Sequence, residues 1–162
     1  MKKGNEELVN TKRLSLRAMT DTETERLIDS CADEELCEAY REMLSGSREN
    51  ANNRIWYAPW SIVRKSDGEF IGDIEFKGAA VNGAVEIGYG VEAEYEGRGY
   101  ATEALRGMCA WAFEQSGVTL VEAETAPDNA ASRRVLEKCG FVPNGEGKEG
   151  PRFALKKECT CL

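Results

Sequence analysis

Histidine is absent from this 162-residue chain, and its six cysteines form no Cys-x-x-Cys pair. Structural zinc sites need cysteine and histidine ligands at short, regular spacings, so no metal centre is expected. We expect reduced thiols instead, packed on apolar helix faces at Cys109 and Cys139 and lying on a C-terminal tail at Cys159 and Cys161. No disulfide or structural metal is required for stability, because a chain of this length buries about 70% of its unfolded surface.

A long apolar run is also lacking. The opening Met-Lys-Lys-Gly-Asn-Glu-Glu has no apolar core of signal-peptide length, and no segment approaches the ~18 apolar residues of a membrane span. We therefore expect a soluble, cytoplasmic protein with no membrane partner. Basic residues are outnumbered, 21 against 29 acidic, for a net charge of −8. Nucleic acid would be repelled by such a surface, whereas a cationic partner is easier to accommodate.

Two glycines lie between a predicted strand and a predicted helix. Residues 95–105 read Tyr-Glu-Gly-Arg-Gly-Tyr-Ala-Thr-Glu-Ala-Leu and follow an apolar-alternating run at 85–91. Apolar residues then recur at helical spacing, which predicts a strand, a glycine loop and a helix. The first N–H groups of a helix have no intrahelical partner, and glycine lets an anion approach them closely. Gly97 and Gly99 therefore predict a phosphate site.

Other interpretations of this loop can be compared with the sequence. A Rossmann fingerprint needs glycine or alanine where Thr102 stands, and a P-loop needs a Gly-Lys-Ser/Thr run that the chain does not contain. An ordinary tight turn remains an alternative on this motif alone.

The rest of the chain alternates strands with helices. A capping box of Thr20 and Glu23 starts a helix through about residue 30, and an acidic-faced helix at 33–44 precedes a polar loop to residue 53. Strands are predicted at 12–17, 55–65, 69–77, 84–91, 118–124 and 151–157 and near 141–142, the last before a turn at 144–147. Further helices are predicted at 99–115 and from 129 to Gly140. The order predicts an α+β fold with a mixed sheet.

The turn predicted at Asn82 and Gly83 sets an expected strand register. With a two-residue turn there, Glu75 would lie opposite Gly90, on the same sheet face as Glu86.

A second motif, Asn-Ala-Ala-Ser-Arg-Arg-Val-Leu-Glu-Lys-Cys-Gly-Phe at 129–141, follows the glycine loop. Together with Glu-Tyr-Glu-Gly-Arg-Gly at 94–99 and the Tyr-Ala-Thr-Glu-Ala run after it, this motif resembles the GNAT superfamily of acetyl-CoA-dependent N-acetyltransferases. The resemblance is to its Rim-type branch in particular, named for enzymes that acetylate ribosomal protein N-termini. The family loop begins with Gln or Arg where this chain has Glu94, so one customary side chain is missing.

The resemblance covers about residues 11–157 and implies a fold, a domain and a donor. It implies a single domain, 1–162, with a mostly antiparallel central sheet of about six to seven strands, about four helices, and tails at 1–10 and 158–162. Acetyl-CoA would be the acetyl donor, without a metal. It would be held by the backbone of the strand before the loop, by the loop itself and by the start of the second motif: Tyr89, Gly90, Val91, Gly97, Arg98, Gly99, Tyr100, Ala101, Thr102 and Asn129.

Acetyl transfer to an amine also needs a base and a protonated leaving thiolate. Without histidine the base candidates are carboxylates, and strand geometry favours Glu86 and Glu75, with Glu124 third; a solvated edge carboxylate is the alternative for each. Many relatives have a tyrosine as general acid seven residues after the asparagine, where this chain has Leu136. Ser132 is then the available hydroxyl, and its alternative role is a helix cap.

The function predicted is transfer of an acetyl group to a primary amine by direct attack on the thioester. The acceptor would be a protein N-terminus or a small-molecule amine, and the acidic helices favour a cationic one. The protein would be a monomer or a homodimer. A non-catalytic acyl-CoA-binding module is the competing interpretation, because Leu136 removes the customary acid.

Overall fold

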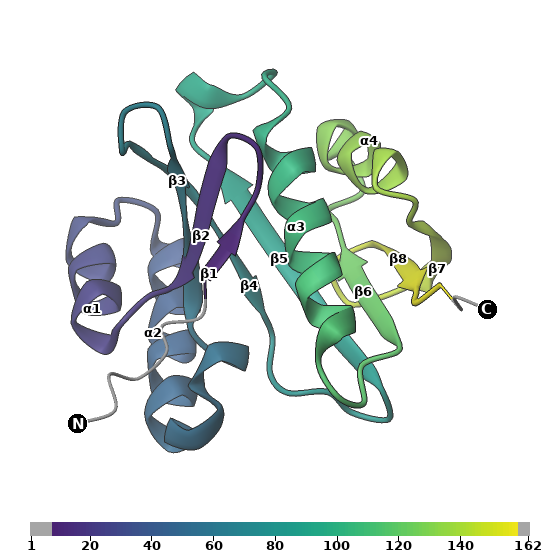
Figure 1. Ribbon diagram of the computed structural model, residues 1–162, viewed down its shortest axis with the longest axis horizontal. Helices are drawn as coiled ribbons and strands as arrows, with labels where there is room; N and C mark the ends of the chain where they lie inside the picture. The colour runs from purple at the N-terminus through teal and green to yellow at the C-terminus, as the bar shows by residue number, and fades with distance from the viewer. Residues whose placement is uncertain (1–7, 159–162) are drawn as a thin grey trace.

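The computed structural model describes residues 8–158, which form one sheet flanked by helices (Figure 1). The sheet has eight strands in the order β1-β2-β3-β4-β5-β6-β8-β7. Neighbouring strands are antiparallel except for the parallel pair β5–β6. The strands are β1 Leu8–Asn10, β2 Leu14–Ala18, β3 Pro59–Arg64, β4 Phe70–Phe76, β5 Ala84–Val91, β6 Leu120–Glu124, β7 Val142–Glu146 and β8 Pro151–Lys156. The helices are α1 Asp21–Ser30, α2 Glu34–Glu49, α3 Tyr100–Glu114 and α4 Ala130–Lys138, with 3-10 turns η1 Ala51–Trp56 and η2 Ala93–Tyr95.

Helices cover both faces of the sheet, and strand alternation decides what each face carries. On β4, Ile74 and Phe76 join the buried core that α3 covers with Met108 and Trp111. The alternate residues Asp73 and Glu75 face the other way, where α2 packs, and there the Tyr40 hydroxyl donates to Asp73. One face of β4 is therefore apolar and the other acidic.

The α+β class with a mixed, mostly antiparallel sheet is confirmed, but the predicted strand count was too low. The extra strand is β1, which pairs with β2 through Val9 and Leu16 and lies in the segment predicted to be a tail. Three residues are too few for a clear period-two pattern, so pairing with β2 decides this strand. The remaining predicted tail residues, 1–7 and 159–162, with Cys159 and Cys161, lie outside the described residues.

Helix α1 begins as predicted, with the capping box of Thr20 and Glu23 formed. The polar loop predicted at 45–53 was wrong, because α2 continues to Glu49 and a 3-10 turn follows. Ser47 is buried there and donates to the Met43 carbonyl at 2.8 Å. A Cβ on Gly46 would come 3.1 Å from the Tyr57 ring. Tertiary packing thus outweighs the low helix propensity of this stretch.

The predicted register of β4 and β5 was wrong by two residues. The turn itself forms, with Asn82 and Gly83 at φ 51° and 83° between bridged Val81 and Ala84. The Lys77 N–H then donates to the Glu86 carbonyl at 2.9 Å, so residues 78–80 bulge out of the ladder. Glu75 consequently pairs with Gly88, and Asp73 takes the place opposite Gly90. A two-residue shift keeps every side chain on its face, so Glu75 and Glu86 still share one.

The turn predicted at 144–147 was also wrong. Strand β7 continues to Glu146 through an irregular pairing with β8, and the chain reverses at 147–150 instead. The Gly147 N–H donates to the Gly150 carbonyl at 2.8 Å, which closes that turn.

Candidate functional site

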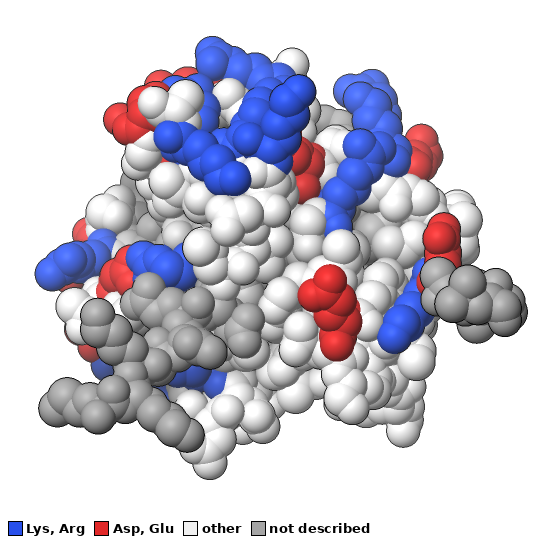
Figure 2. All heavy atoms as spheres, in the orientation of Figure 1, with Lys and Arg blue, Asp and Glu red and all other residues white. Residues whose placement is uncertain are grey.

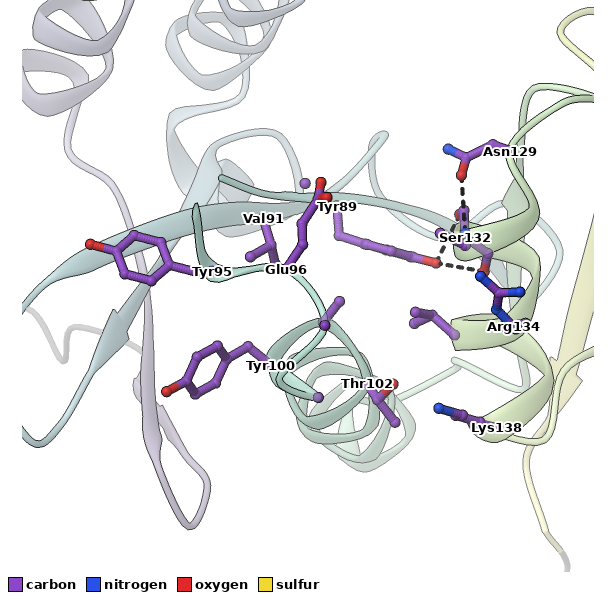
Figure 3. A pocket seen from close by; sticks show the side chains of 16 residues that line it. Tyr89, Val91, Tyr95, Glu96, Tyr100, Thr102, Asn129, Ser132, Arg134 and Lys138 are labelled. Atoms are coloured by element: carbon purple, nitrogen blue, oxygen red, sulfur yellow. Dashed lines mark hydrogen bonds between the residues drawn. The ribbon is translucent and has the colours of Figure 1, made fainter. Parts of the chain in front are cut away.

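A cleft opens where the two parallel strands separate. β5 and β6 pair over three residues, Ala84–Glu86 with Leu120–Glu122, and diverge beyond them. The end of β5, the start of α3 and the start of α4 line a cleft of about 610 Å³ in the gap (Figure 3). A crevice beyond the carboxyl ends of diverging strands is a usual position for a ligand site in sheets with parallel strands.

The ladder alternation points main-chain groups into this cleft. The Glu86 carbonyl and the Glu92 N–H both hydrogen-bond to the β4 side. The main-chain groups of the even-numbered residues of β5 are therefore hydrogen-bonded to that strand. The main-chain groups of Tyr89 and Val91 point the other way, toward the gap that β6 has left. These groups are positioned to bind a polar, extended ligand.

The glycine loop forms the other wall, and its geometry suits an anion. Gly97 and Gly99 have φ of 76° and 81°, the left-handed region where glycine is favoured. Gly99 is the N-cap of α3 and no side chain caps this helix end within the described residues. The first N–H groups of α3 therefore remain available to an anion, with the positive end of the helix dipole behind them. A Cβ at Gly97 would meet nothing within 4 Å, so the loop surface is open.

A clamp from the β1–β2 hairpin holds the loop. Glu103, in the first turn of α3, accepts hydrogen bonds from Thr11 at 2.5 Å and from the Arg13 Nε at 2.7 Å. Arg13 also donates to the Arg98 carbonyl at 3.0 Å and lies over the Tyr100 ring, 4.3 Å from its centroid. The Arg98 side chain turns away to donate to the Glu94 carbonyl at 3.3 Å. Arg98 is the one predicted cofactor residue that does not line the cleft.

Cations line the rim of the cleft although the chain is acidic overall. Arg134 and Lys138 stand one turn apart on α4, and Figure 3 shows Lys138 extending toward Thr102 on α3. Figure 2 shows Lys and Arg gathered along the edge above α4 and above the β1–β2 turn. Sequence reasoning missed Lys138, although its i, i+4 spacing from Arg134 could have indicated it. This rim suits a ligand that carries several phosphates.

Two hydroxyl groups meet inside the cleft. The Asn129 side chain caps α4 by accepting from the Ser132 N–H at 3.0 Å, so the cap role belongs to Asn129 and Ser132 keeps its hydroxyl for other partners. The Tyr89 hydroxyl lies 3.0 Å from the Ser132 Oγ (Figure 3). Burial is the main cause that raises the pKa of Tyr89 to about 12, so its proton stays on at neutral pH. Leu136 is fully buried in the core, so its side chain has no access to the cleft.

None of the three candidate base carboxylates lines this cleft. Glu86 is ion-paired to Lys77 at 3.6 Å and to Arg152 at 3.2 Å. Glu124 accepts from the N–H groups of residues 149 and 150, which, more than the nearby Arg152, keep its pKa low. Glu75 is buried on the α2 side of β4, next to Asp73. Glu86 and Glu124 are thus held in ion pairs and hydrogen bonds, whereas Glu75 is buried beside a second carboxyl group.

The acidic faces of α1 and α2 are partly neutralised. Five of their carboxylates form ion pairs with arginine: Asp21 with Arg54, Glu23 with Arg17, Glu25 with Arg48, and Glu34 and Glu38 with Arg41. Within residues 8–158 no cluster of His, Cys, Asp or Glu could hold a metal ion, and no helix there is long and apolar enough to cross a membrane.

Comparison with known proteins agrees with this geometry. A family model described as an acetyltransferase (GNAT) domain matches residues 13–142. The uncharacterized N-acetyltransferase YoaA of Bacillus subtilis is 30% identical over 149 residues, 85% of this chain and 84% of YoaA. YjdG of the same organism, also an uncharacterized N-acetyltransferase, is 34% identical over 99 residues, 60% of this chain and 59% of YjdG, so the match spans less than two thirds of that relative.

Solved structures show the same fold at lower identity. RimJ of Mycobacterium smegmatis, in complex with CoA-disulfide, superposes with a TM-score of 0.71 at 22% identity, covering 94% of this chain and 88% of RimJ. The ribosomal-protein-S5-alanine acetyltransferase of Vibrio fischeri has a TM-score of 0.71 at 18% identity, covering 93% and 96%.

Proposed function

Because the chain belongs to the GNAT acetyltransferase family, we propose that it moves the acetyl group of acetyl-CoA to a primary amine by direct attack on the thioester. The observation that carries this proposal is the cleft between the end of β5 and α4. Its free main-chain groups at Tyr89 and Val91 lie on one side, and the glycine loop at the start of α3 lies on the other.

Each wall of the cleft suits one part of the donor. Gly97, Gly99 and the first N–H groups of α3 would hold the pyrophosphate, with Arg134 and Lys138 balancing its charge. The main-chain groups of Tyr89 and Val91 would hydrogen-bond the extended pantetheine arm, and one N–H would stabilise the oxyanion that forms at the thioester carbonyl. Asn129 stands at the same wall, although its side-chain oxygen already accepts from Ser132.

The leaving thiolate needs a proton, and the cleft offers hydroxyls for it. In this proposal Ser132 passes its proton to the sulfur and Tyr89, at 3.0 Å, supports the hydroxyl that gives it up. For the base we favour Glu75 over Glu86, because Glu86 already balances Lys77 and Arg152. The oxygens of Glu86 are thus already contacted by two cations, whereas Oε2 of Glu75 has no hydrogen-bond partner within the described residues.

The acceptor belongs to one of two classes in this proposal, a protein N-terminus or a small-molecule amine. The fold neighbours that act on ribosomal proteins support the first class. The test is an acceptor screen with acetyl-CoA, including peptides with free N-terminal serine or alanine and polyamines. Products should be read by mass spectrometry, because partly exposed thiols such as those of Cys31 and Cys139 would react with thiol reagents. Acetylated product supports the proposal. Tight CoA binding without turnover of any amine would indicate the acyl-CoA-binding module instead.

A further inference from the structure

A buried pair of carboxyl groups faces α2 behind the cleft. Asp73 and Glu75 are alternate residues of β4 and so project from the same face of the sheet. The Tyr40 hydroxyl of α2 donates to Asp73 Oδ1 at 2.8 Å. Glu75 is only 9% exposed, and within the described residues its Oε2 has no hydrogen-bond partner. A buried carboxylate oxygen without a partner costs free energy, so it indicates a ligand that would complete the site.

The residues of β5 opposite this pair are glycines, which have no side chains. Gly88 and Gly90 of β5 face the same side, with Gly88 opposite Glu75 and Gly90 opposite Asp73. A Cβ on Gly88 would come 3.1 Å from the Glu75 Oε1, whereas a Cβ on Gly90 would meet nothing within 4 Å. Gly90 is exposed and also lines the cofactor cleft. The carboxyl pair therefore lies one strand spacing, about 5 Å, from the cleft, with no β5 side chain between them.

The pair carries charge that the protein itself compensates weakly. Burial, followed by the Asp73 charge, raises the pKa of Glu75 well above its usual range. Burial also raises the pKa of Asp73, against hydrogen bonds from Glu75 and Tyr40. Two adjacent buried carboxyls do not readily ionise together, so the pair favours sharing a proton until a cation binds. The groups that act on this pair are Tyr40 of α2, which donates to Asp73, and Lys77, which directly follows β4 and is already paired with Glu86.

We propose that the acceptor amine binds here as a primary ammonium ion, donating N–H bonds to Asp73 and to the unpartnered Oε2 of Glu75, with Tyr40 positioning Asp73. This inference rests on the proposed function. It adds that the acceptor is a cation and that it approaches from the α2 side of the sheet. A primary ammonium has three N–H donors on one small atom, which suits two adjacent carboxyls beside a glycine strip. The donor and the acceptor then meet from opposite faces across Gly90.

The transfer balances with these groups. The ammonium displaces the shared proton to solvent as it binds, leaving Glu75 ionised. The Glu75 carboxylate then takes a proton from the ammonium, and the neutral amine attacks the thioester carbon. The C–N bond forms and the C–S bond breaks. The remaining excess proton on nitrogen, relayed through the Ser132 hydroxyl, ends on the departing sulfur, giving the amide and the CoA thiol.

The test compares three variants that keep side-chain shape: Asp73→Asn, Glu75→Gln and Tyr40→Phe. The probes are spermidine and a peptide amide with a free N-terminal serine. For whichever probe is turned over, Asp73→Asn should raise the acceptor KM about tenfold or more and Tyr40→Phe should raise it severalfold, with an unchanged Kd for acetyl-CoA by calorimetry. Glu75→Gln should lower kcat/KM at pH 7, and part of that loss should be recovered as the pH rises and the amine deprotonates without a base. Glu42→Gln, on the exposed side of α2, is the matched control and should change neither value.

A second readout does not depend on turnover. With CoA bound, spermidine should raise the unfolding temperature of the wild type and of Glu42→Gln but not that of Asp73→Asn. Should Asp73→Asn fail to fold, the same comparison is made with Glu75→Gln and Tyr40→Phe. An acceptor KM within twofold of wild type in all folded variants, or an undiminished spermidine shift, would overturn the ammonium site. Absence of acetylated product from the wild type with every amine would instead refute the proposed function.

Discussion

The hydroxyl of Tyr89 lies 3.0 Å from the Oγ of Ser132, across the cleft between β5 and α4. Neither residue is at position 136, where the family resemblance would place a tyrosine acid and where Leu136 is fully buried. The pair brings together two hydroxyls from separate elements, and it gives the cleft a proton donor that no single motif contains.

The hydroxyl pair predicts a shared effect on turnover. Ser132→Ala and Tyr89→Phe should each lower kcat by about 10- to 100-fold, and the double variant should be little worse than the stronger single one, because general acid catalysis acts through one relay. Since the pKa of Tyr89 is about 12, Tyr89 keeps its proton below about pH 9, so Tyr89→Phe should not change the shape of the kcat–pH profile in that range. Steady-state kinetics from pH 6 to 9 would check this. Strictly multiplicative losses would argue for two independent roles.

The cap at the start of α4 is a separate prediction. Asn129→Ala should cost about 1 kcal/mol of stability, because it removes the acceptor of the Ser132 N–H. Ser132→Ala should cost much less, since its N–H bond does not involve the side chain. Urea unfolding of both variants measures the difference. Equal losses would return Ser132 to a structural role.

The glycine loop predicts loss of donor binding without loss of fold. Gly97→Val should weaken acetyl-CoA affinity by 10-fold or more, because a branched side chain would occupy the space that a phosphate needs. Gly117→Val is the matched control: both glycines have positive φ, 76° and 83°, and neither would have a Cβ contact within 4 Å. Gly117 follows the far end of α3, so its variant should share the backbone strain and keep full affinity in calorimetry. Unchanged affinity in a folded Gly97→Val would refute the phosphate site.

Close approach of β4 and β5 predicts opposite outcomes for two glycines on these neighbouring strands. A Cβ on Gly72 would come 2.1 Å from the Gly90 carbonyl oxygen, which is backbone and cannot rotate away. Gly72→Ala should therefore destabilise the fold by about 1–3 kcal/mol and displace the end of β5. Gly90→Ala has no such clash, so it should leave stability unchanged while raising the acceptor KM. Thermal unfolding and kinetics together distinguish the two, and a neutral Gly72→Ala would contradict the observed approach.

The clamp at Glu103 predicts a pH-dependent contribution to stability. Burial raises the pKa of Glu103, but hydrogen bonds from Thr11 and Arg13 outweigh it and leave the pKa below its usual value. A lowered folded pKa means that the stabilisation is present above the unfolded pKa of about 4.3 and disappears as the pH falls through the folded value. Glu103→Gln should cost about 1–2 kcal/mol at pH 7, and the difference from wild type should shrink below about pH 4. Urea unfolding at pH 7 and pH 3 measures this. A constant difference would mean that the carboxylate charge contributes nothing.

Local signals in the sequence determined much of this protein. The capping box of α1, the turn at Asn82 and Gly83, the strand at 84–91 and the glycine loop before α3 each depend on residues within a few positions of one another. Short-range hydrogen bonds and backbone preferences decide such features, so the class of fold and the glycine loop that we propose as a phosphate site could be predicted from them. The register of β4 could not, because the bulge at 78–80 depends on how the two strands pack.

Only the tertiary structure brings together the side chains to which we assign the chemistry. Tyr89 meets Ser132 across 43 positions of sequence and Tyr40 meets Asp73 across 33, and no local pattern marks either contact. The tertiary structure also pairs Glu86 with Arg152 and leaves Oε2 of Glu75 without a hydrogen-bond partner within the described residues. Strand pairing sets the burial and the neighbouring charges of a carboxylate, so Glu75 and Glu86 acquired different surroundings although they share one face of the sheet.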